Sequence, residues 1–360
     1  MGAKKGLSPR SSSPVAGFAK GRFRPVHFIW LLLLGMFFLS KHCIIFLGEI
    51  NDVCYGKSFS MQPRAKNSID HEHALDCAAL NTENDPGIDV KVHNSCVAPE
   101  FKMNVHPTGD LVSRFIRSWG CFECSLVKKF MRFLAQTPPD TFLLDMGANM
   151  GWYSLHAAAL GRDVFAFEPF QKNYQRICKS TTILNKGFDD RIVVFNVALT
   201  DHPTTIGFGY VSEKNFGGIH VEESDAVKTK AADAVRGVDY APGIQLSSLK
   251  DVLPTNRPAV IKIDVERAEC EALGGALDYL HTIDLLYVQI EWNPAPMGAC
   301  KHRDAIFELF RKNRLTPYQH YPIQDVWKPL DVKEYSQWHN SWLIEKVGNY
   351  PFIDIAWIRE

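Results

Sequence analysis

Between residues 141 and 168, two short apolar segments each end next to an acidic residue, and a helical segment separates them. The first segment, 141–145, ends in Asp145, and the second, 164–167, is followed by Glu168. Alternation of strands and helices predicts a parallel sheet with right-handed crossovers. Ligands bind such sheets at the carboxyl ends of the strands. We therefore expect Asp145 and Glu168 to face one crevice.

The pattern continues along the chain. Beyond the helix predicted over 152–160, the sequence predicts helices over 171–185 and 269–280, further strands over 191–197, 260–263 and 285–290, and a last strand over 353–358. Gly274 and Gly275 weaken the helix predicted over 269–280, because glycine is unfavourable inside a helix. Residues 208–220 contain three glycines and predict a hairpin insertion that could border the substrate.

The spacing of the glycines indicates the kind of nucleotide. A dinucleotide fingerprint is G-x-G-x-x-G, whereas this chain has Gly147 and Gly151 separated by three residues and preceded by Asp145. An acid beside the loop would repel a pyrophosphate but suits the cationic methionine part of S-adenosylmethionine. Glu168 lies 23 residues after Asp145, where a carboxylate can accept both ribose hydroxyls. The alternative is that the two glycines only let the helix pack closely on the strand.

Several motifs in the same order resemble the FkbM-type, S-adenosylmethionine-dependent methyltransferases. The similar segments are Leu144-Asp145-Met146-Gly147-Ala148-Asn149-Met150-Gly151, Phe167-Glu168-Pro169, Asn196-Val197-Ala198-Leu199, Asn215-Phe216-Gly217-Gly218, residues 261–269, and Gly120-Cys121-Phe122-Glu123 upstream. The resemblance covers about residues 110–360. One position departs from the family pattern, because Arg267 stands where the family usually has Gly.

The resemblance implies a Rossmann-like class I methyltransferase fold, an α/β architecture with a seven-stranded, mostly parallel sheet flanked by helices, in which residues 353–358 lie antiparallel beside the fifth strand. It also implies S-adenosylmethionine as the cofactor and a hydroxyl group as the acceptor. Position by position, the residues expected to bind the cofactor are Asp145, Gly147, Asn149 and Gly151 at the methionine end, Glu168 at the ribose and Asn196 near the adenine.

Two acids are candidates for the base that takes the acceptor proton. A neutral sugar hydroxyl is a poor nucleophile, and a carboxylate within about 3 Å can remove its proton as the transition state forms. Asp264, at the end of the fourth strand, is the first candidate, and Glu266 is the second. The alternatives are cofactor binding or helix capping for Asp264, and a structural hydrogen bond for Glu266. We predict no metal, because no dense set of His, Asp and Glu accompanies these acids.

The N-terminus predicts a membrane anchor. Residues 1–27 contain six Lys and Arg and no acid, which is typical of a cytoplasmic tail, and residues 28–48 are apolar over about the 20 residues that span a bilayer. We expect a single-pass type II protein of the secretory pathway, in the Golgi, with the catalytic domain in the lumen. A cleaved signal peptide, an organelle transit peptide and a buried helix are the alternatives.

Residues 49–108 are expected to form a stem, and residues 109–360 the methyltransferase domain. The stem contains Cys54, Cys77 and Cys96, which could form disulfides in a lumen, although their pairing cannot be deduced. Without the seven basic residues up to Lys41, the chain carries 33 basic and 40 acidic residues, which argues against nucleic acid as a partner. The sequence gives no information on the oligomeric state.

The function predicted from the sequence is a membrane-anchored O-methyltransferase that acts on a hydroxyl of a glycan or a secreted metabolite. One alternative is an NAD(P)-dependent oxidoreductase on a related fold, and another is a non-catalytic lumenal binding protein. The absence of G-x-G-x-x-G argues against the first alternative. Intact Asp145, Gly147, Gly151 and Glu168 argue against the second.

Overall fold

The computed structural model describes residues 71–80, 86–92, 98–107, 109–208, 221–223, 240–292, 299–321, 325–330 and 353–360. These residues belong to one compact unit, Val53–Glu360. The predicted anchor over residues 28–48, together with Cys54 and Cys96, lies outside the described residues. Within the described residues, no helix is both long and apolar enough to cross a membrane.

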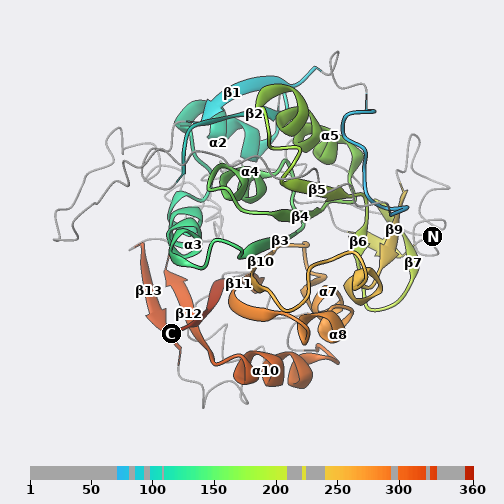
Figure 1. Ribbon diagram of the computed structural model, residues 1–360, viewed down its shortest axis with the longest axis vertical. Coiled ribbons are helices and arrows are strands. Elements are labelled where there is room, and N and C mark those ends of the chain that lie inside the picture. Colours follow the sequence, from blue (N-terminus) through green and yellow to red (C-terminus); the bar gives the residue numbers. More distant parts are fainter. Residues whose placement is uncertain are drawn as a thin grey trace, which may run out of the picture. The chain divides into compact units, whose positions relative to one another are not determined.

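An eight-stranded sheet forms the centre of this unit (Figure 1). Its order is β13-β12-β14-β11-β10-β3-β4-β5, with the strands bounded by Val326–Pro329, Leu315–Tyr321, Ile353–Arg359, Asp284–Trp292, Pro258–Ile263, Phe142–Met146, Val164–Phe167 and Ile192–Phe195. The five strands from β11 to β5 are parallel, and β14 pairs antiparallel with β11 as predicted. The predicted number of seven strands is wrong, because β13 pairs with β12 and adds an eighth strand.

The side of the sheet on which successive strands are added changes between β3 and β10. From β3 the chain proceeds to β4 and β5 on one side, and from β10 to β11 on the other. In the shared register, Lys262 lies opposite Asp145 and Ile263 opposite Met146. Such a switch point opens a crevice at the carboxyl ends of the two strands. The loops that follow β3 and β10 therefore meet there.

Side chains of β3 alternate between two hydrophobic cores. Phe142, Leu144 and Met146 pack in one core, whereas Leu143 packs in the other. Successive residues of a strand point to opposite faces, so one strand contributes to both cores. The helices α2, α3, α4 and α5 (Leu111–Trp119, Cys124–Gln136, Trp152–Ala159 and Gln171–Lys179) cover the face of Leu143, and α7, α8 and α10 (Glu269–Gly274, Leu277–Leu280 and Arg303–Lys312) cover the other (Figure 1).

Two of the predicted helices differ from regular α-helices. The helix that starts at Gln171 continues after Lys179 as a π-helical turn, Ser180–Leu184. The helix predicted over 269–280 is divided into α7 and α8 next to the glycine pair. A Cβ atom on Gly275 would lie 1.9 Å from the carbonyl oxygen of Thr200, so only glycine allows this close approach.

A second sheet of four strands lies after β5. Its order is β6-β9-β7-β8, with bounds Ala198–Leu199, Tyr240–Ile244, Thr204–Phe208 and Val221–Glu223. The strands β7 and β8 pair antiparallel, with Phe208 opposite Val221. They flank the segment predicted as a hairpin over 208–220, of which residues 209–220, with the Asn215-Phe216-Gly217-Gly218 motif, lie outside the described residues.

The segment predicted as a stem packs onto the domain in its described parts. The strands β1 (Ile88–Val92) and β2 (Phe101–Val105) form an antiparallel hairpin whose Met103 and Val105 belong to the core on the α4 side. Residue Ala74 bridges to Phe195 of β5, and the Leu75 N–H donates to the Val194 carbonyl (2.8 Å). An edge strand offers unpaired backbone groups, and this segment covers them. The periodic apolar residues of β2 are too few to predict this packing from the sequence.

Three disulfides link the described cysteines. They join Cys77 to Cys178, Cys121 to Cys124, and Cys270 to Cys300. The first bond links the predicted stem to α5. The sequence alone did not indicate which cysteine pairs with Cys77. The second bond joins two cysteines that are three residues apart in the sequence.

Candidate active site

The loop after β3 is built on left-handed backbone conformations. Gly147, Asn149 and Gly151 have φ values of 79°, 51° and 84°. Glycine adopts this region without strain, and Asn tolerates it better than most residues do. The loop is bonded to the next strand, because the N–H groups of Gly147 and Ala148 donate to the carbonyl of Phe167 (both 3.0 Å). The loop therefore has a fixed shape at the carboxyl ends of β3 and β4.

Asp145 lies in β3, two residues before Gly147. Its carboxylate accepts a hydrogen bond from the Ser154 hydroxyl of α4 (2.5 Å), and the side chain is buried. Burial raises the pKa of Asp145 to about 6, and the Ser154 hydrogen bond opposes part of that rise. This acid thus links β3 to α4 at the position where the methionine end of the cofactor was predicted.

Glu168 is held by donors on both of its oxygens. Oε2 accepts the Asn149 N–H (2.7 Å), while Oε1 accepts the Phe170 N–H (3.0 Å) and the Asn173 amide (3.3 Å). The side chain is buried, and burial raises its pKa to about 8 despite these donors. The carboxylate is therefore fixed in one orientation beside the glycine loop, and Oε2, which accepts one of these donors, keeps a lone pair for a further one.

Two predicted cofactor residues carry buried side-chain oxygens that lack a hydrogen-bond partner within the described residues. They are Oδ1 of Asn149 and Oδ1 of Asn196. Asn196 follows β5, and its N–H donates to the carbonyl of His73 (3.1 Å). Buried polar atoms are normally paired. The loops after β3 and β5 thus offer acceptors suited to a polar ligand beside Glu168.

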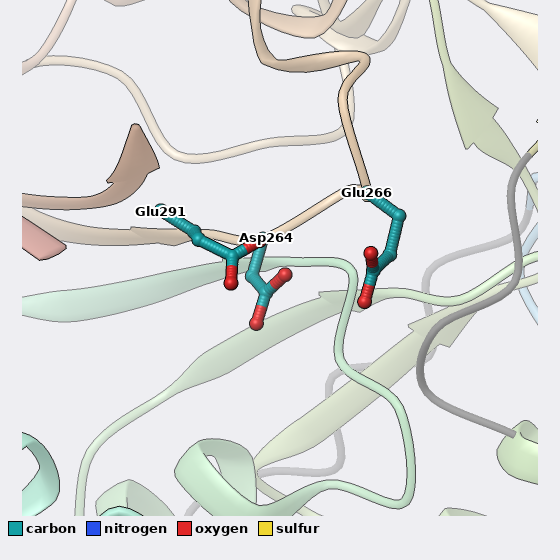
Figure 2. Close-up of side chains that lie close together, drawn as sticks. All are labelled: Asp264, Glu266 and Glu291. Atoms are coloured by element: carbon teal, nitrogen blue, oxygen red, sulfur yellow. The ribbon is translucent and has the colours of Figure 1, made fainter. Parts of the chain in front are cut away.

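Three carboxylates converge at the ends of β10 and β11 (Figure 2). Asp264 and Glu266 follow β10, Glu291 lies near the end of β11, and each offers an oxygen within 4.8 Å of the others. The Asp264 N–H donates to the carbonyl of Met146 in β3 (3.0 Å). The cluster Asp264–Glu266–Glu291, hereafter the acidic cluster, therefore borders the glycine loop. Oxygens at this spacing have a geometry that can hold a divalent cation.

The backbone after Asp264 is left-handed at two consecutive residues. Glu266 and Arg267 have φ values of 53° and 78°. The carboxylate of Glu269 closes this turn by accepting the N–H groups of Val265 (3.2 Å) and Arg267 (3.3 Å). A left-handed φ favours glycine, the residue that the resemblance implies at the position of Arg267.

Lys262 is the buried cation of this region. Its Nζ lies 3.0 Å from Asp264 Oδ2 and 5.2 Å from the centre of the Tyr153 ring. The surrounding carboxylates, with Asp264 foremost, raise the pKa of Lys262 despite its burial. The ion pair fixes Asp264 and holds one of its oxygens, so this acid is less available as a base than its position in the sequence implies.

The remaining acids of the site are hard to ionise. Burial, with repulsion from Asp264 second, raises the pKa of Glu266 to about 8 and also raises that of Glu291. Burial likewise raises the pKa of Glu123 to about 8 and that of Asp354 to about 7. One lysine faces several carboxylates here, and a cationic ligand would favour their ionised forms.

Some of the residues of this site were predicted from the sequence, and others were not. The predicted cofactor residues Asp145, Gly147, Asn149, Gly151 and Glu168 share one loop region, and Asp264 and Glu266 lie at the end of β10. Glu291 directly follows the strand predicted over 285–290, but no role was predicted for it. That position, next to β10 in a parallel sheet, was the available signal. Lys262 and Asp354 gave none, because a lysine or an acid in a strand is ordinary.

The comparisons with known proteins bear on this site. Residues 145–314 match the sequence model of the methyltransferase FkbM domain. This chain contains a methyltransferase FkbM domain. The match begins at Asp145 and includes every predicted site residue, from the glycine loop to Asp264 and Glu266. The predicted family is thus confirmed, and its cofactor is S-adenosylmethionine.

Similar proteins were also found among curated sequences and solved structures. The chain is 27% identical over 210 residues to the AMB antimetabolite synthetase AmbE of Pseudomonas aeruginosa, covering 49% of this chain and 10% of that protein. The chain thus spans about a tenth of the length of this relative. A SAM-dependent methyltransferase from Agrobacterium tumefaciens has a TM-score of 0.34 at 11% identity, covering 72% of this chain and 68% of that one. A SAM-dependent O-methyltransferase from Thermotoga maritima has a TM-score of 0.29 at 9% identity, covering 75% and 78%.

The residues of the FkbM domain fit this cofactor. The unpartnered oxygens of Asn149 and Asn196 lie in the loops predicted at its methionine end and near its adenine. The carboxylates around Lys262 suit a ligand whose sulfur and amino groups carry positive charge. A dinucleotide would instead place a pyrophosphate against Asp145, which the electrostatics disfavour.

Proposed function

We propose that this chain is an S-adenosylmethionine-dependent O-methyltransferase whose acceptor is a hydroxyl of a glycan or of a secreted small molecule. The observation that carries the proposal is the hydrogen bond between the Asp264 N–H and the Met146 carbonyl (3.0 Å), together with the register of β3 and β10. It joins the cofactor loop and the acidic cluster in one switch-point crevice. A methyl donor and a proton acceptor would thus lie side by side.

The cofactor would be held by the residues described above. Glu168 would bind the ribose hydroxyls, Asn196 would lie near the adenine, and the loop from Asp145 to Gly151 would surround the methionine end. When bound, S-adenosylmethionine supplies a methyl group that is electrophilic because it is attached to a sulfonium. Alignment of the acceptor oxygen with that methyl group provides much of the rate, since orientation alone can supply roughly 7–11 kcal/mol.

The base is better assigned to Glu266 than to Asp264. Asp264 is paired with Lys262, whereas burial raises the pKa of Glu266 to about 8. A base works best when its pKa is near the working pH. The Glu266 carboxylate would take the hydroxyl proton while the acceptor oxygen is methylated. Asp264 would then position Lys262 and the loop that carries Glu266.

The acidic cluster also favours a class of acceptor. Carboxylates accept hydrogen bonds from several neighbouring hydroxyls and repel anions. A neutral polyhydroxylated acceptor fits this chemistry, and a phosphorylated or carboxylated one does not.

Two acceptors that differ in one group test whether the methyl group is transferred to oxygen or to nitrogen. The full-length chain should methylate a sugar and not the amino sugar that replaces one hydroxyl, and preference for the amino sugar would exclude an O-methyltransferase.

Calorimetric titration of the full-length chain with S-adenosylmethionine, with NAD as the control, tests the function directly. Micromolar binding of S-adenosylmethionine alone is expected. Binding of NAD alone would favour an oxidoreductase, and binding of neither would favour a non-catalytic role. The same protein then serves for the acceptor pair.

The proposal includes membrane anchoring through residues 28–48 and a lumenal catalytic domain, in the Golgi. The three disulfides support it, because disulfides persist mainly in oxidising compartments. Alkaline carbonate extraction and protease protection of a C-terminal tag test it. The tag should be protected in intact vesicles and the chain retained in the membrane, and a protease-sensitive tag would overturn the topology.

A further inference from the structure

A chain of hydrogen bonds connects His106 to Glu168. His106 Nε2 lies 2.9 Å from Asn173 Oδ1, and Asn173 Nδ2 donates to Glu168 Oε1 at 3.3 Å. All three side chains are buried, with exposed fractions of 2% for His106, 2% for Asn173 and 5% for Glu168. His106 precedes residue 145 and so lies outside the stretch that matches the FkbM domain.

The direction of each hydrogen bond follows from its last acceptor. Glu168 Oε1 can only accept from the amide, so Asn173 must turn its NH₂ group to Glu168 and its oxygen to His106. His106 must then carry a hydrogen on Nε2 to donate to that oxygen. Burial, the largest effect, lowers the pKa of His106, which favours the neutral ring with this one tautomer.

The backbone around His106 is fixed to the glycine loop. The His106 N–H donates to the Ser113 hydroxyl (3.0 Å), and that hydroxyl lies 3.3 Å from the sulfur of Met150. The Ser113 N–H in turn donates to Asp110 at the start of α2 (2.8 Å). The imidazole is therefore held relative to the same loop that bonds Glu168 through Asn149.

We propose that His106 is a positioning residue for Glu168, acting through the Asn173 amide, so that the carboxylate keeps the orientation that binds the cofactor ribose. This inference rests on the proposed binding of S-adenosylmethionine by Glu168. Without the His106 donor, the Asn173 oxygen loses this partner, and the NH₂ group is held less firmly against Glu168 Oε1. The carboxylate is then less well fixed in the orientation that binds the ribose.

The dissociation constant for S-adenosylmethionine measures this effect in the full-length chain. His106→Leu is expected to raise it about 5- to 10-fold, as one net hydrogen bond would. His106→Gln retains an N–H donor and should recover most of the affinity. His156→Leu is the matched control, because His156 is equally buried in α4 and bonds the Trp152 carbonyl instead (2.7 Å). The control should lower the thermal midpoint and leave the dissociation constant within twofold.

A double-mutant cycle separates positioning from general stability. If His106 acts through Glu168, His106→Leu should have little further effect in a Glu168→Gln background. Asn173→Asp places an oxygen against Glu168 Oε1 and tests the same link if His106→Leu does not fold. Additive effects, or equal effects of His106→Leu and His156→Leu, would overturn the inference while the wild-type chain still binds. Failure of the wild-type chain to bind S-adenosylmethionine would instead refute the proposed function.

Discussion

Gly147 and the carbonyl oxygen of Asp264 are in such close contact that no side chain fits between them. A Cβ atom on Gly147 would lie 1.9 Å from that oxygen, and the φ of Gly147 is 79°. The loop after β3 thus packs directly on the backbone that follows β10. The cofactor loop and the acidic cluster are held together by this contact.

Replacement of Gly147 by Ala should therefore disturb both stability and cofactor binding. A left-handed Ala costs roughly 1–2 kcal/mol, and the collision with backbone adds to that cost. Gly161→Ala is a matched control, because its φ is 78° and a Cβ there meets nothing within 4 Å. In urea unfolding and calorimetry, Gly147→Ala should lose more stability and bind S-adenosylmethionine at least tenfold more weakly. Equal behaviour of the two variants would contradict the importance of the contact.

Loss of the Glu168 carboxylate should weaken cofactor binding strongly. Glu168→Ala removes the proposed ribose acceptor and frees three donors, Asn149, Phe170 and Asn173, from their shared partner. We expect the dissociation constant for S-adenosylmethionine to rise at least tenfold in calorimetry. Glu271→Ala, at an exposed position of α7, should have no effect. Unchanged affinity of Glu168→Ala would remove the ribose assignment.

The rate of methyl transfer should rise with pH. A base must be deprotonated to act, and the pKa of Glu266 is raised to about 8. We expect kcat/KM to increase through pH 8, and Glu266→Gln to lose activity at all pH values. Asp264→Asn should also reduce turnover, but it breaks the pair with buried Lys262 and should lower the thermal midpoint too. A fully active Glu266→Gln would return the role of base to Asp264.

The raised pKa of Glu266 also predicts that the free energy of unfolding falls as pH rises. The pKa of Glu266 is about 8 in the folded chain against an ordinary value of 4.5, so the folded state binds more protons between these values. The free energy of unfolding should therefore decrease from about pH 4.5 to pH 8. Chemical unfolding at several pH values measures this slope. In Glu266→Gln the slope should be smaller, and an unchanged slope would show that Glu266 does not contribute.

Arg267 should be more strained than glycine at its position. Its φ of 78° is left-handed, and its side chain is exposed. Arg267→Gly removes the steric cost, whereas Arg267→Ala retains it. We expect the Gly variant to be about 1 kcal/mol more stable than the Ala variant in urea unfolding. The opposite order would mean that the Arg267 backbone is not strained.

Local sequence patterns were sufficient for the centre of the fold. The apolar segments around Leu144, Phe165 and Ile261 formed parallel strands because such runs can be buried on both faces. Glycine positions were equally informative, since Gly147 and Gly151 adopt φ values that other residues avoid. The acids at the strand ends could be assigned to one crevice because parallel strands end at one edge.

Long-range contacts were not visible in the sequence. The disulfide between Cys77 and Cys178 and the hydrogen bond from the Asn104 N–H to the Ser180 hydroxyl join residues far apart in the chain, whereas β13 is a short strand that pairs with the nearby β12. Short strands carry weak patterns, and disulfide pairing depends on which cysteines the fold brings together. The hydrogen bond between His106 and Asn173 also joins residues that are far apart in the chain.

The sequence by itself determined the order of strands and helices, the glycine loop and the positions of the strand-end acids, because each follows from local backbone preference and burial. Only the tertiary structure decided how those acids behave. Lys262 and Asp264 are two residues apart in the sequence, but the other carboxylates that act on Lys262, Glu123 and Glu291, come from distant parts of the chain. A carboxylate's pKa is set by the charges and the solvent around it, and folding brings these together from distant parts of the chain.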